Sequence, residues 1–282
     1  MAVAGIDDPN AAALLAAAPA PKRVGVTTGV PRPGEFGVVD GVLVDRAFGS
    51  TGSGGAELLD ARSVHPPGPP GITDALAAAA LARADGVAPE AVRTALEGFR
   101  PGRHRAEPVA TVRAVTYVDD SKATNPHAAA ASLAAVRPGA RVVWIVGGLL
   151  KGASVDELVA RHAGRLRGVV VIGTDRTEIL GALARHAPEV PVTEVITGDD
   201  GPVPAAVTMT LAVQGAAALA RPGDVVLLAP AAASMDQFRD YAARGDAFAT
   251  AVARLDPTAV AGLDPTAVAR LDPTAVAGSD RA

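Results

Sequence analysis

Three short segments combine charged, hydroxyl and glycine residues at points where an apolar run ends. The first, Tyr117–Asn125, passes from aliphatic residues into Asp-Asp-Ser-Lys-Ala-Thr-Asn. If a strand ends here and a helix follows, backbone N–H groups and the side chains of Ser121, Lys122 and Thr124 converge on one point, which suits an anionic group. The same residues also fit a helix N-cap beside a solvated lysine, and spacing alone does not separate the two interpretations.

The second segment, Trp144–Gly152, places a Gly-Gly pair after an aliphatic run and a lysine shortly beyond it. Glycine lets the backbone approach a ligand closely, and Lys151 could neutralise a carboxylate or a phosphate. Without further context, a Gly-Gly pair is more often an ordinary turn.

The third segment, Leu227–Phe238, opens from an aliphatic run into small residues. These residues leave room for a ligand beside Ser234. Asp236 could serve only as the N-cap of the helix that follows.

The remaining titratable residues suggest less chemistry. The cluster Arg103-His104-Arg105, taken alone, is typical of solvated surface. No Ser/His/Asp arrangement stands out, and metal ligands remain unknown. Four histidines show no metal-ligand spacing and are interpreted as structural or exposed: His65, His127, His162 and His186.

The segments with chemistry lie in a region that alternates between aliphatic runs and helical patterning, from about Val115 to Arg254. This alternation predicts a doubly wound, mostly parallel sheet, whose ligands bind at the carboxyl ends of the strands. The expected strands are Val115–Val118, Arg141–Val146, Gly168–Ile172, Val192–Ile196 and Asp224–Leu228, and the expected helices are Asn125–Val136, Val155–Arg165, Thr177–His186, Ala205–Ala220 and Asp236–Arg254.

The first hundred residues are rich in glycine and proline and carry shorter strand signals. Phe36–Val39 and Val42–Val44 flank an Asp-Gly pair, which predicts a β-hairpin. Ser50–Gly55 is typical of a flexible loop. Two helices are expected, Ile72–Ala84 with Thr73 or Asp74 as its N-cap, and Pro89–Phe99.

The C-terminal end repeats LDPTAVAG, LDPTAVAR and LDPTAVAG from Leu255 to Gly278. An Asp-Pro in each unit stops a long helix, and three copies are too short for a solenoid. We expect residues 255–282 to be a dispensable tail; the alternative is a partner-binding repeat.

Composition excludes several classes of protein. The 282 residues carry 26 Lys+Arg against 30 Asp+Glu, a net charge of −4, with no basic block, so we expect no general nucleic-acid binding. With Cys 0 there is no disulfide framework or cysteine nucleophile. The apolar runs are too short for a membrane span and the first residues lack a cationic leader, so we expect a soluble, cytoplasmic protein.

Taken in chain order, these motifs resemble the C-terminal half of the Mur ligase family, in its D-glutamate-adding branch. The resemblance covers about Ala4 to Leu255 and implies an α/β fold. It implies a Rossmann-like Mur ligase C-terminal domain at 103–254, preceded by a remnant of the central ATP-binding domain at 1–102. The motifs are His104-Arg105, Asp120–Asn125, Gly147-Gly148 with Lys151, Pro230–Phe238 and Arg244–Phe248.

The resemblance implies ATP-dependent ligation of D-glutamate to UDP-N-acetylmuramoyl-L-alanine through an acyl phosphate, a step in peptidoglycan precursor synthesis. Magnesium and lysine charges would stabilise the phosphoryl transfer. Each residue role is implied by the same resemblance. Lys122 and Thr124 would face the reacting groups, Arg105, Asp120, His104 and Asp74 would lie at the nucleotide, and Lys151, Ser234, the Met235 backbone and Tyr241 would form the D-glutamate pocket.

The sequence also departs from the family pattern. It contains no G-x-x-x-x-G-K-[ST] phosphate loop, and Pro69–Gly71 and Ala232 stand where many relatives carry His-Asn and Cys. We therefore expect an N-terminally shortened ligase that is inactive unless a separate N-terminal half is supplied. The alternative is a non-catalytic module that binds D-glutamate or nucleotide, or an inert fragment. A nicotinamide-dependent oxidoreductase is disfavoured because the first strand-to-helix turn is DDSKATN rather than G-x-G-x-x-G.

Overall fold

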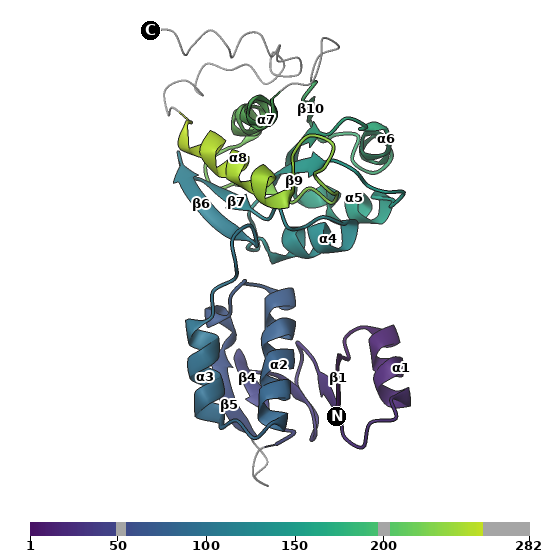
Figure 1. Ribbon diagram of the computed structural model, residues 1–282, viewed down its shortest axis with the longest axis vertical. Helices are drawn as coiled ribbons and strands as arrows, with labels where there is room; N and C mark the ends of the chain where they lie inside the picture. Colours follow the sequence, from purple (N-terminus) through teal and green to yellow (C-terminus); the bar gives the residue numbers. More distant parts are fainter. Residues whose placement is uncertain (49–54, 197–203, 256–282) are drawn as a thin grey trace. The chain divides into compact units, whose positions relative to one another are not determined.

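The structure is a computed structural model that describes residues 1–48, 55–196 and 204–255 (Figure 1). Its contacts divide the chain into two compact units, Met1–Pro101 and Gly102–Ala282. Residues 50–54 of the expected Ser50–Gly55 loop and residues 256–282 of the expected repeat tail lie outside the described residues.

The first unit is built on a five-stranded sheet with the order β1-β2-β3-β4-β5. Strands β1 to β3 are parallel, while β3, β4 and β5 are antiparallel neighbours. Helix α2 packs on β1, β2 and β3, and α3 packs on β5 and α2. The elements are β1 (Ala2–Gly5), α1 (Pro9–Ala17), β2 (Arg23–Val26), β3 (Phe36–Val39), β4 (Val42–Asp45), β5 (Ala56–Asp60), η1 (Ala61–Ser63), α2 (Pro69–Ala84) and α3 (Pro89–Gly98).

The predicted hairpin is confirmed by the antiparallel pairing of β3 with β4. Asp40 and Gly41 between them have φ values of 50° and 80°. Both lie in the left-handed region that a tight two-residue hairpin turn requires, which explains the Asp-Gly pair.

The start of α2 differs from the prediction. The helix begins at Pro69, and its N-cap is Gly68, without a side-chain cap bond. Thr73 and Asp74 therefore lie inside the helix, and the prediction that one of them is the N-cap is wrong. Proline is compatible with the first helical turn because its missing N–H has no partner there.

The second unit confirms the mostly parallel α/β fold. Its six-stranded sheet has the order β10-β9-β8-β11-β7-β6, parallel throughout except for β6, which runs antiparallel to β7 at one edge. The edge strand β6 was not predicted. The strands are β6 (Glu107–Val112), β7 (Val115–Asp119), β8 (Val142–Gly147), β9 (Leu166–Ile172), β10 (Val192–Glu194) and β11 (Val225–Leu228).

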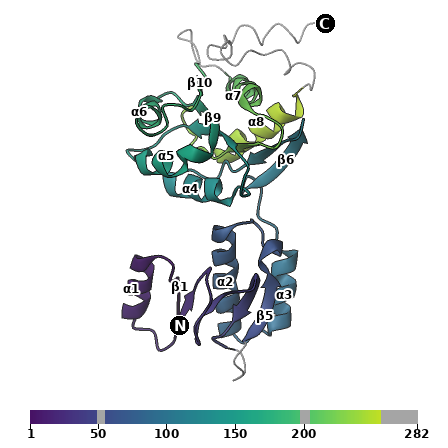
Figure 2. The same ribbon diagram turned by 180° about the vertical axis from the view of Figure 1, so that it is seen from behind.

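Helices cover both faces of this sheet (Figure 2). Alternate residues of β8 separate the two cores: Trp144 packs with the face of α4, α5 and α6, and Ile145 packs with the face of α7 and α8. The helices are α4 (Pro126–Ala135), α5 (Asp156–His162) with η2 (Ala163–Arg165), α6 (Thr177–His186), α7 (Ala205–Leu219) and α8 (Tyr241–Ala253).

The N-caps of α4 and α8 fix where the loops after β7 and β11 end. Helix α4 is capped by Asn125, whose side chain accepts from Ala128 N, as the predicted range implies. Helix α8 begins at Tyr241, with Asp240 as the N-cap. The predicted start at Asp236 is therefore wrong. Within the described ranges, no helix is long and apolar enough to span a bilayer.

Candidate active site

The three segments that carry the candidate site residues meet because β7, β11 and β8 are neighbours in a parallel sheet. These segments are residues 117–125, 144–152 and 227–238. The loop after β11 contacts both of the others. Ala231 N donates to Ala123 O at 3.0 Å, and Leu149 forms an antiparallel bridge with Ala233. The carboxyl edge of the sheet thus carries one connected set of loops.

The close approach of the β8 and β11 loops requires glycine. Gly148 has a φ of 128°, and a Cβ on it would lie 2.3 Å from the carbonyl oxygen of Ala233. A side chain would therefore push the two loops apart.

The β11 loop also holds the start of the loop after β9. A carboxylate oxygen of Asp236 accepts from Thr174 N at 3.0 Å, and the side-chain carbonyl of Gln237 accepts from Gly173 N at 2.8 Å. This long-range contact, rather than helix capping, is the role of Asp236.

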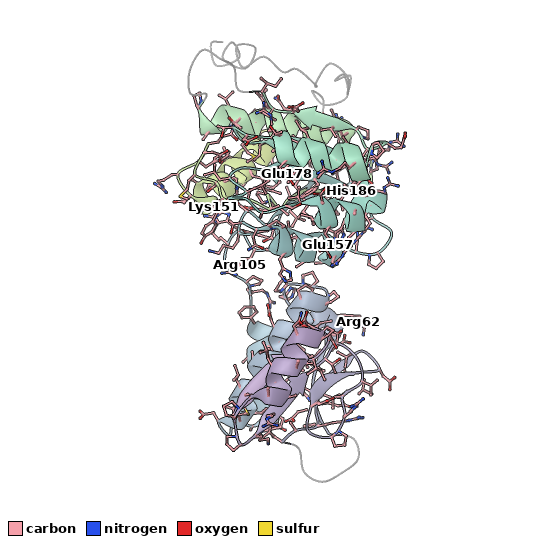
Figure 3. The ribbon with its side chains drawn as sticks, turned by 90° about the vertical axis from the view of Figure 1, so that its right-hand side faces the viewer. Arg62, Arg105, Lys151, Glu157, Glu178 and His186 are labelled. Carbon is pink, nitrogen blue, oxygen red and sulfur yellow. The ribbon has the colours of Figure 1, made fainter. Side chains whose placement is uncertain are left out.

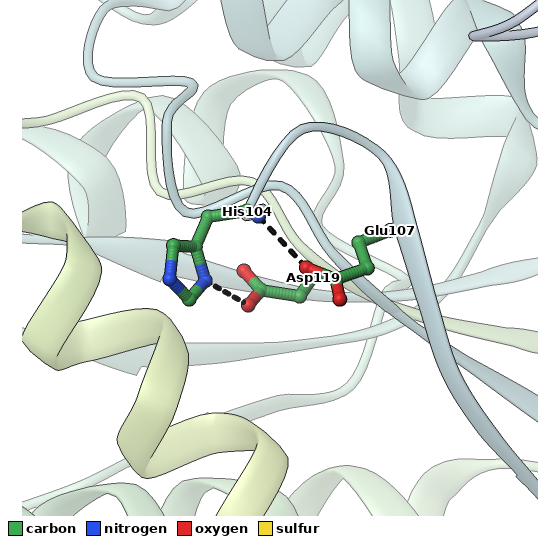
Figure 4. Close-up of side chains that lie close together, drawn as sticks. All are labelled: His104, Glu107 and Asp119. Atoms are coloured by element: carbon green, nitrogen blue, oxygen red, sulfur yellow. Dashed lines mark hydrogen bonds and ion pairs between the residues drawn. The ribbon is translucent and has the colours of Figure 1, made fainter. Parts of the chain in front are cut away.

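A buried histidine–aspartate pair lies beside the end of β7 (Figure 4). His104 Nδ1 lies 2.7 Å from Oδ2 of Asp119, the last residue of β7, and Glu107 accepts from His104 N at 2.9 Å. His104 is 3% exposed, so the expectation that its cluster is solvated surface is wrong for this residue. Burial raises the pKa of Asp119, opposed by the hydrogen bonds from His104 and Ser121 N.

His104, Glu107 and Asp119 each offer a ligand atom within 4.8 Å of the others. The hydrogen bonds among them account for this arrangement without an ion. We therefore interpret the cluster as a buried hydrogen-bond network that holds the chain before β6 against the end of β7.

Asp120 is the first residue beyond β7 and is half-buried. Burial raises the pKa of its carboxyl, opposed by hydrogen bonds from the Ser132 hydroxyl and from Ala106 N. The positive charge of Arg105 also opposes this rise in the pKa of Asp120. The Arg105 side chain is exposed (Figure 3). This pair combines a carboxylate that accepts a hydrogen bond from a hydroxyl group with a cation that is exposed to solvent.

The structure brings Lys122, Tyr241 and His104 together. Lys122 Nζ lies 3.9 Å from the centre of the Tyr241 ring, and the His104 ring meets the same ring edge-on, with centroids 6.3 Å apart. The Ser121 hydroxyl donates to the Tyr241 carbonyl at 2.7 Å. The start of α8 is therefore tied to the loop after β7.

Lys151 lies at a separate cavity of about 430 Å³, lined by residues 148–154 with Asp175 and Glu178. Its side chain is exposed and its φ is 53°, in the left-handed region (Figure 3). The cavity combines a lysine and two carboxylates, so it could accept a ligand that carries both signs of charge.

The other predicted residues lie in different surroundings. Ser234 is buried and Met235 is 62% exposed, both in the β11 loop. Thr124 is half-buried, and its N–H donates to Lys122 O at 2.8 Å. Asp74 is exposed on α2, in the first unit.

Arg244 begins the motif Arg244–Phe248, but its residue type and spacing predict no role for it. Its side chain is 0% exposed, and its guanidinium donates to Ser121 Oγ at 3.0 Å, Ser121 O at 2.9 Å and Ala232 O at 3.1 Å. Burial lowers the pKa of Arg244 to about 10, so it remains charged at neutral pH. An arginine in an alanine-rich helix gave no signal of burial.

Comparison with known proteins identifies the family of this chain. Residues 104–232 match the family described as Mur ligase, glutamate ligase domain. The chain belongs to the Mur ligase family. It is 55% identical over 272 residues to UDP-N-acetylmuramoylalanine–D-glutamate ligase from Mycobacterium avium, covering 89% of this chain and 54% of that protein. It is 53% identical over 273 residues to the ligase of the same name from Rhodococcus jostii, covering 91% and 53%.

This chain thus spans about half the length of the curated relatives that it matches. Among solved structures, UDP-N-acetylmuramate-alanine ligase MurC from Thermotoga maritima resembles it with a TM-score of 0.50 at 17% identity, over 82% of this chain and 51% of that one. At this identity the likeness supports the fold alone.

Proposed function

We propose that this chain forms part of an ATP-dependent, amide-bond-forming ligase that joins D-glutamate to UDP-N-acetylmuramoyl-L-alanine during peptidoglycan precursor synthesis. The similarity at 55% identity to a ligase of that name carries the proposal. Such a reaction draws on cytoplasmic nucleotide pools, so the proposal includes a cytoplasmic location and small-molecule substrates.

The residues at the strand ends fit the nucleotide in part. The half-buried Asp120 carboxylate can accept hydrogen bonds from ribose hydroxyls, and the exposed Arg105 can pair with phosphate. His104 would act through the network that holds this loop, whereas the assignment of Asp74 to the nucleotide rests on the family alone. When bound, ATP supplies the phosphoryl group that activates the substrate carboxylate.

Magnesium fits less well among the described side chains. The cluster of His104, Glu107 and Asp119 is internally hydrogen bonded, and burial raises the pKa of Asp119, which disfavours a cation-binding carboxylate. We therefore assign no magnesium ligand to this chain, and the proposed dependence on Mg²⁺ rests on the family.

Lys122 and Thr124 are proposed to face the reacting groups. The Lys122 ammonium can stabilise the negative charge that develops when the amine attacks the activated carboxylate. It lies on the face of Tyr241, whose ring restrains it without neutralising it. The Thr124 hydroxyl can donate to a carboxylate or phosphate oxygen.

Lys151, Ser234, the Met235 backbone and Tyr241 are proposed to bind D-glutamate. The exposed Lys151 ammonium at its cavity can pair with a carboxylate. Ser234 and Met235 belong to the loop that is bridged to the Lys151 loop by the pairing of Leu149 with Ala233. Lys151, Ser234 and Met235 thus belong to two loops that are held together, and Tyr241 begins the helix that follows the second loop.

The 282-residue chain is proposed to be inactive by itself because its sequence carries no phosphate loop, which in phosphoryl transfer positions and neutralises the transferred group. The test is product formation from UDP-N-acetylmuramoyl-L-alanine, ATP, magnesium and labelled D-glutamate. It compares this chain alone, the N-terminal half of the Mycobacterium avium relative alone, and their mixture. Turnover only in the mixture supports the proposal, and turnover by this chain alone contradicts the inactivity.

A second candidate is a module that binds D-glutamate without chemistry, which the cavity beside Lys151 favours. An NMR titration of this chain with D-glutamate at millimolar concentration, with L-glutamate as the control, tests it. Shifts of the Lys151 and Ser234 amides with D-glutamate only, together with no turnover in the mixture, would favour the module. No shift and no turnover would leave an inert fragment.

A further inference from the structure

The side chain of Arg244, in α8, joins two loops that carry residues of the proposed site. Its guanidinium donates to both the hydroxyl and the carbonyl of Ser121, in the loop after β7, and to the carbonyl of Ala232, in the loop after β11. Arg244 itself lies in the first turns of α8. One side chain therefore connects the loop that carries Lys122 with the loop that carries Ser234.

The acceptors of Arg244 continue into the rest of the site. The Ser121 hydroxyl accepts from Arg244 Nε and donates to the Tyr241 carbonyl. Tyr241 in turn presents its ring to the Lys122 ammonium. Arg244 is thus linked through Ser121 to the ring that restrains Lys122.

The chemistry of this position is unusual for a core residue. The side chain is 0% exposed and charged, and all three of its acceptors are uncharged oxygens. Taking a charge out of water costs free energy, and an apolar side chain of similar volume is often as stabilising at such a site. Stability alone therefore does not explain an arginine here, whereas its rigid, planar fork can fix several acceptors relative to one another.

We propose that Arg244 is a positioning residue of the ligase, which sets the loop of Lys122 and Thr124 relative to the loop of Ser234 and Met235. The proposal rests on the proposed function for its catalytic consequence. Its structural part, the coupling of the two loops, is independent of that function.

The variants are Arg244→Met, which keeps the volume and removes the fork, and Arg244→Lys, which keeps the charge and one donor group. Ser121→Ala is a third variant that leaves the arginine in place and removes one acceptor. The matched control is Arg165, which donates to Leu133 O, Val136 O and Arg137 O just before β9. Because β9 begins there, Arg165 lies at the amino end of the sheet, away from the proposed site.

The first readout is hydrogen exchange in this chain without ligands. The Ala231 amide donates to Ala123 O and joins the two loops. In Arg244→Met its exchange should rise about tenfold or more, with a smaller rise in Arg244→Lys and Ser121→Ala. Arg165→Met should leave this amide unchanged. Unchanged Ala231 exchange in folded Arg244 variants would overturn the coupling, and if Arg244→Met does not fold, Arg244→Lys decides.

The second readout is kinetic, in the ligating mixture. Misplacing the loops should lower kcat/KM for D-glutamate about 100-fold in Arg244→Met, with partial recovery in Arg244→Lys. The Arg165→Met variant should keep its kcat/KM even if its Tm falls by as much as that of Arg244→Met. An equal loss in both variants would reduce Arg244 to a structural residue. If the wild-type mixture shows no turnover, the proposed function fails while hydrogen exchange still decides the coupling.

Discussion

Gly245 of α8 lies against His104 so closely that a Cβ on the glycine would stand 2.1 Å from the histidine Nδ1. The same Cβ would lie 2.6 Å from Asp119 Oδ2. The buried pair of His104 and Asp119 therefore depends on a helix position without a side chain. Glycine at this position lets the helix approach the pair closely, although glycine lowers the stability of the helix itself.

Gly245→Ala should lower the free energy of unfolding by about 1–3 kcal/mol, because the added methyl group cannot coexist with the buried pair. Urea denaturation followed by circular dichroism measures the change. Gly181→Ala in α6 is the control, since its Cβ would meet only the flexible end of Arg185, at 3.2 Å. That variant should be as stable as the wild type or more so, and equal losses in both would refute the steric argument.

Gly148→Ala should separate the β8 and β11 loops, because its Cβ would collide with the Ala233 carbonyl at 2.3 Å. Strain of this kind costs about 1–3 kcal/mol. Amide exchange of Leu149 and Ala233, which bond to each other at 2.8 and 3.0 Å, should rise. Gly152→Ala in the same loop also places a side chain at a positive φ, 81°, but has open space at its Cβ, so it controls for backbone strain and should leave both amides protected. Protection in Gly148→Ala as well would contradict the prediction.

Tyr241→Leu should release the Lys122 ammonium from the ring that it faces at 3.9 Å. The aromatic ring current should shift the Lys122 side-chain protons upfield in the wild type, and this shift should vanish in Tyr241→Leu. Tyr241→Phe keeps the ring face and should keep the shift, because the cation–π attraction needs no hydroxyl. Random-coil Lys122 shifts in the wild type would show that the contact is not formed in solution.

Asp120 should make the stability of the protein depend on pH in a defined sense. Burial raises the pKa of its carboxyl above the ordinary value of 3.8, so the folded state keeps the proton to higher pH than the unfolded state does. Its contribution is most favourable below the unfolded pKa and is lost as pH rises through the folded pKa.

Comparison with Asp120→Asn isolates this effect. The free energy of unfolding of the wild type, minus that of the variant, should fall as pH rises from about 4 towards 7. Urea denaturation at several pH values measures the difference. A difference that rises with pH would mean that the hydrogen bonds from Ser132 and Ala106 N outweigh burial.

The sequence predicted most of the second unit for a simple physical reason. Aliphatic runs such as Arg141–Val146 and Gly168–Ile172 alternate with helical segments, and parallel strands joined by helices bring all their carboxyl ends to one edge. The meeting of the Lys122, Lys151 and Ser234 loops follows from that rule. The short hairpin was equally accessible, because Asp40-Gly41 suits a turn with left-handed φ values.

Boundaries that depend on long-range contacts could not be predicted. Asp236 fits a helix N-cap locally, yet its carboxylate accepts from Thr174 N, 62 positions away in the chain, and α8 begins only after Asp240. The edge strand β6 was missed because it exists through its pairing with β7 rather than through a periodic pattern of its own.

By itself, the sequence of this protein determined the fold class, the order of most elements and the edge of the sheet where the candidate site residues gather, because these follow from local patterning and from the geometry of parallel strands. Only the tertiary structure decided that His104 is buried on Asp119, that Gly245 makes room for them, and that Arg244 spans two loops. Burial of a charged side chain depends on acceptors that are distant in the chain, and no local pattern records them.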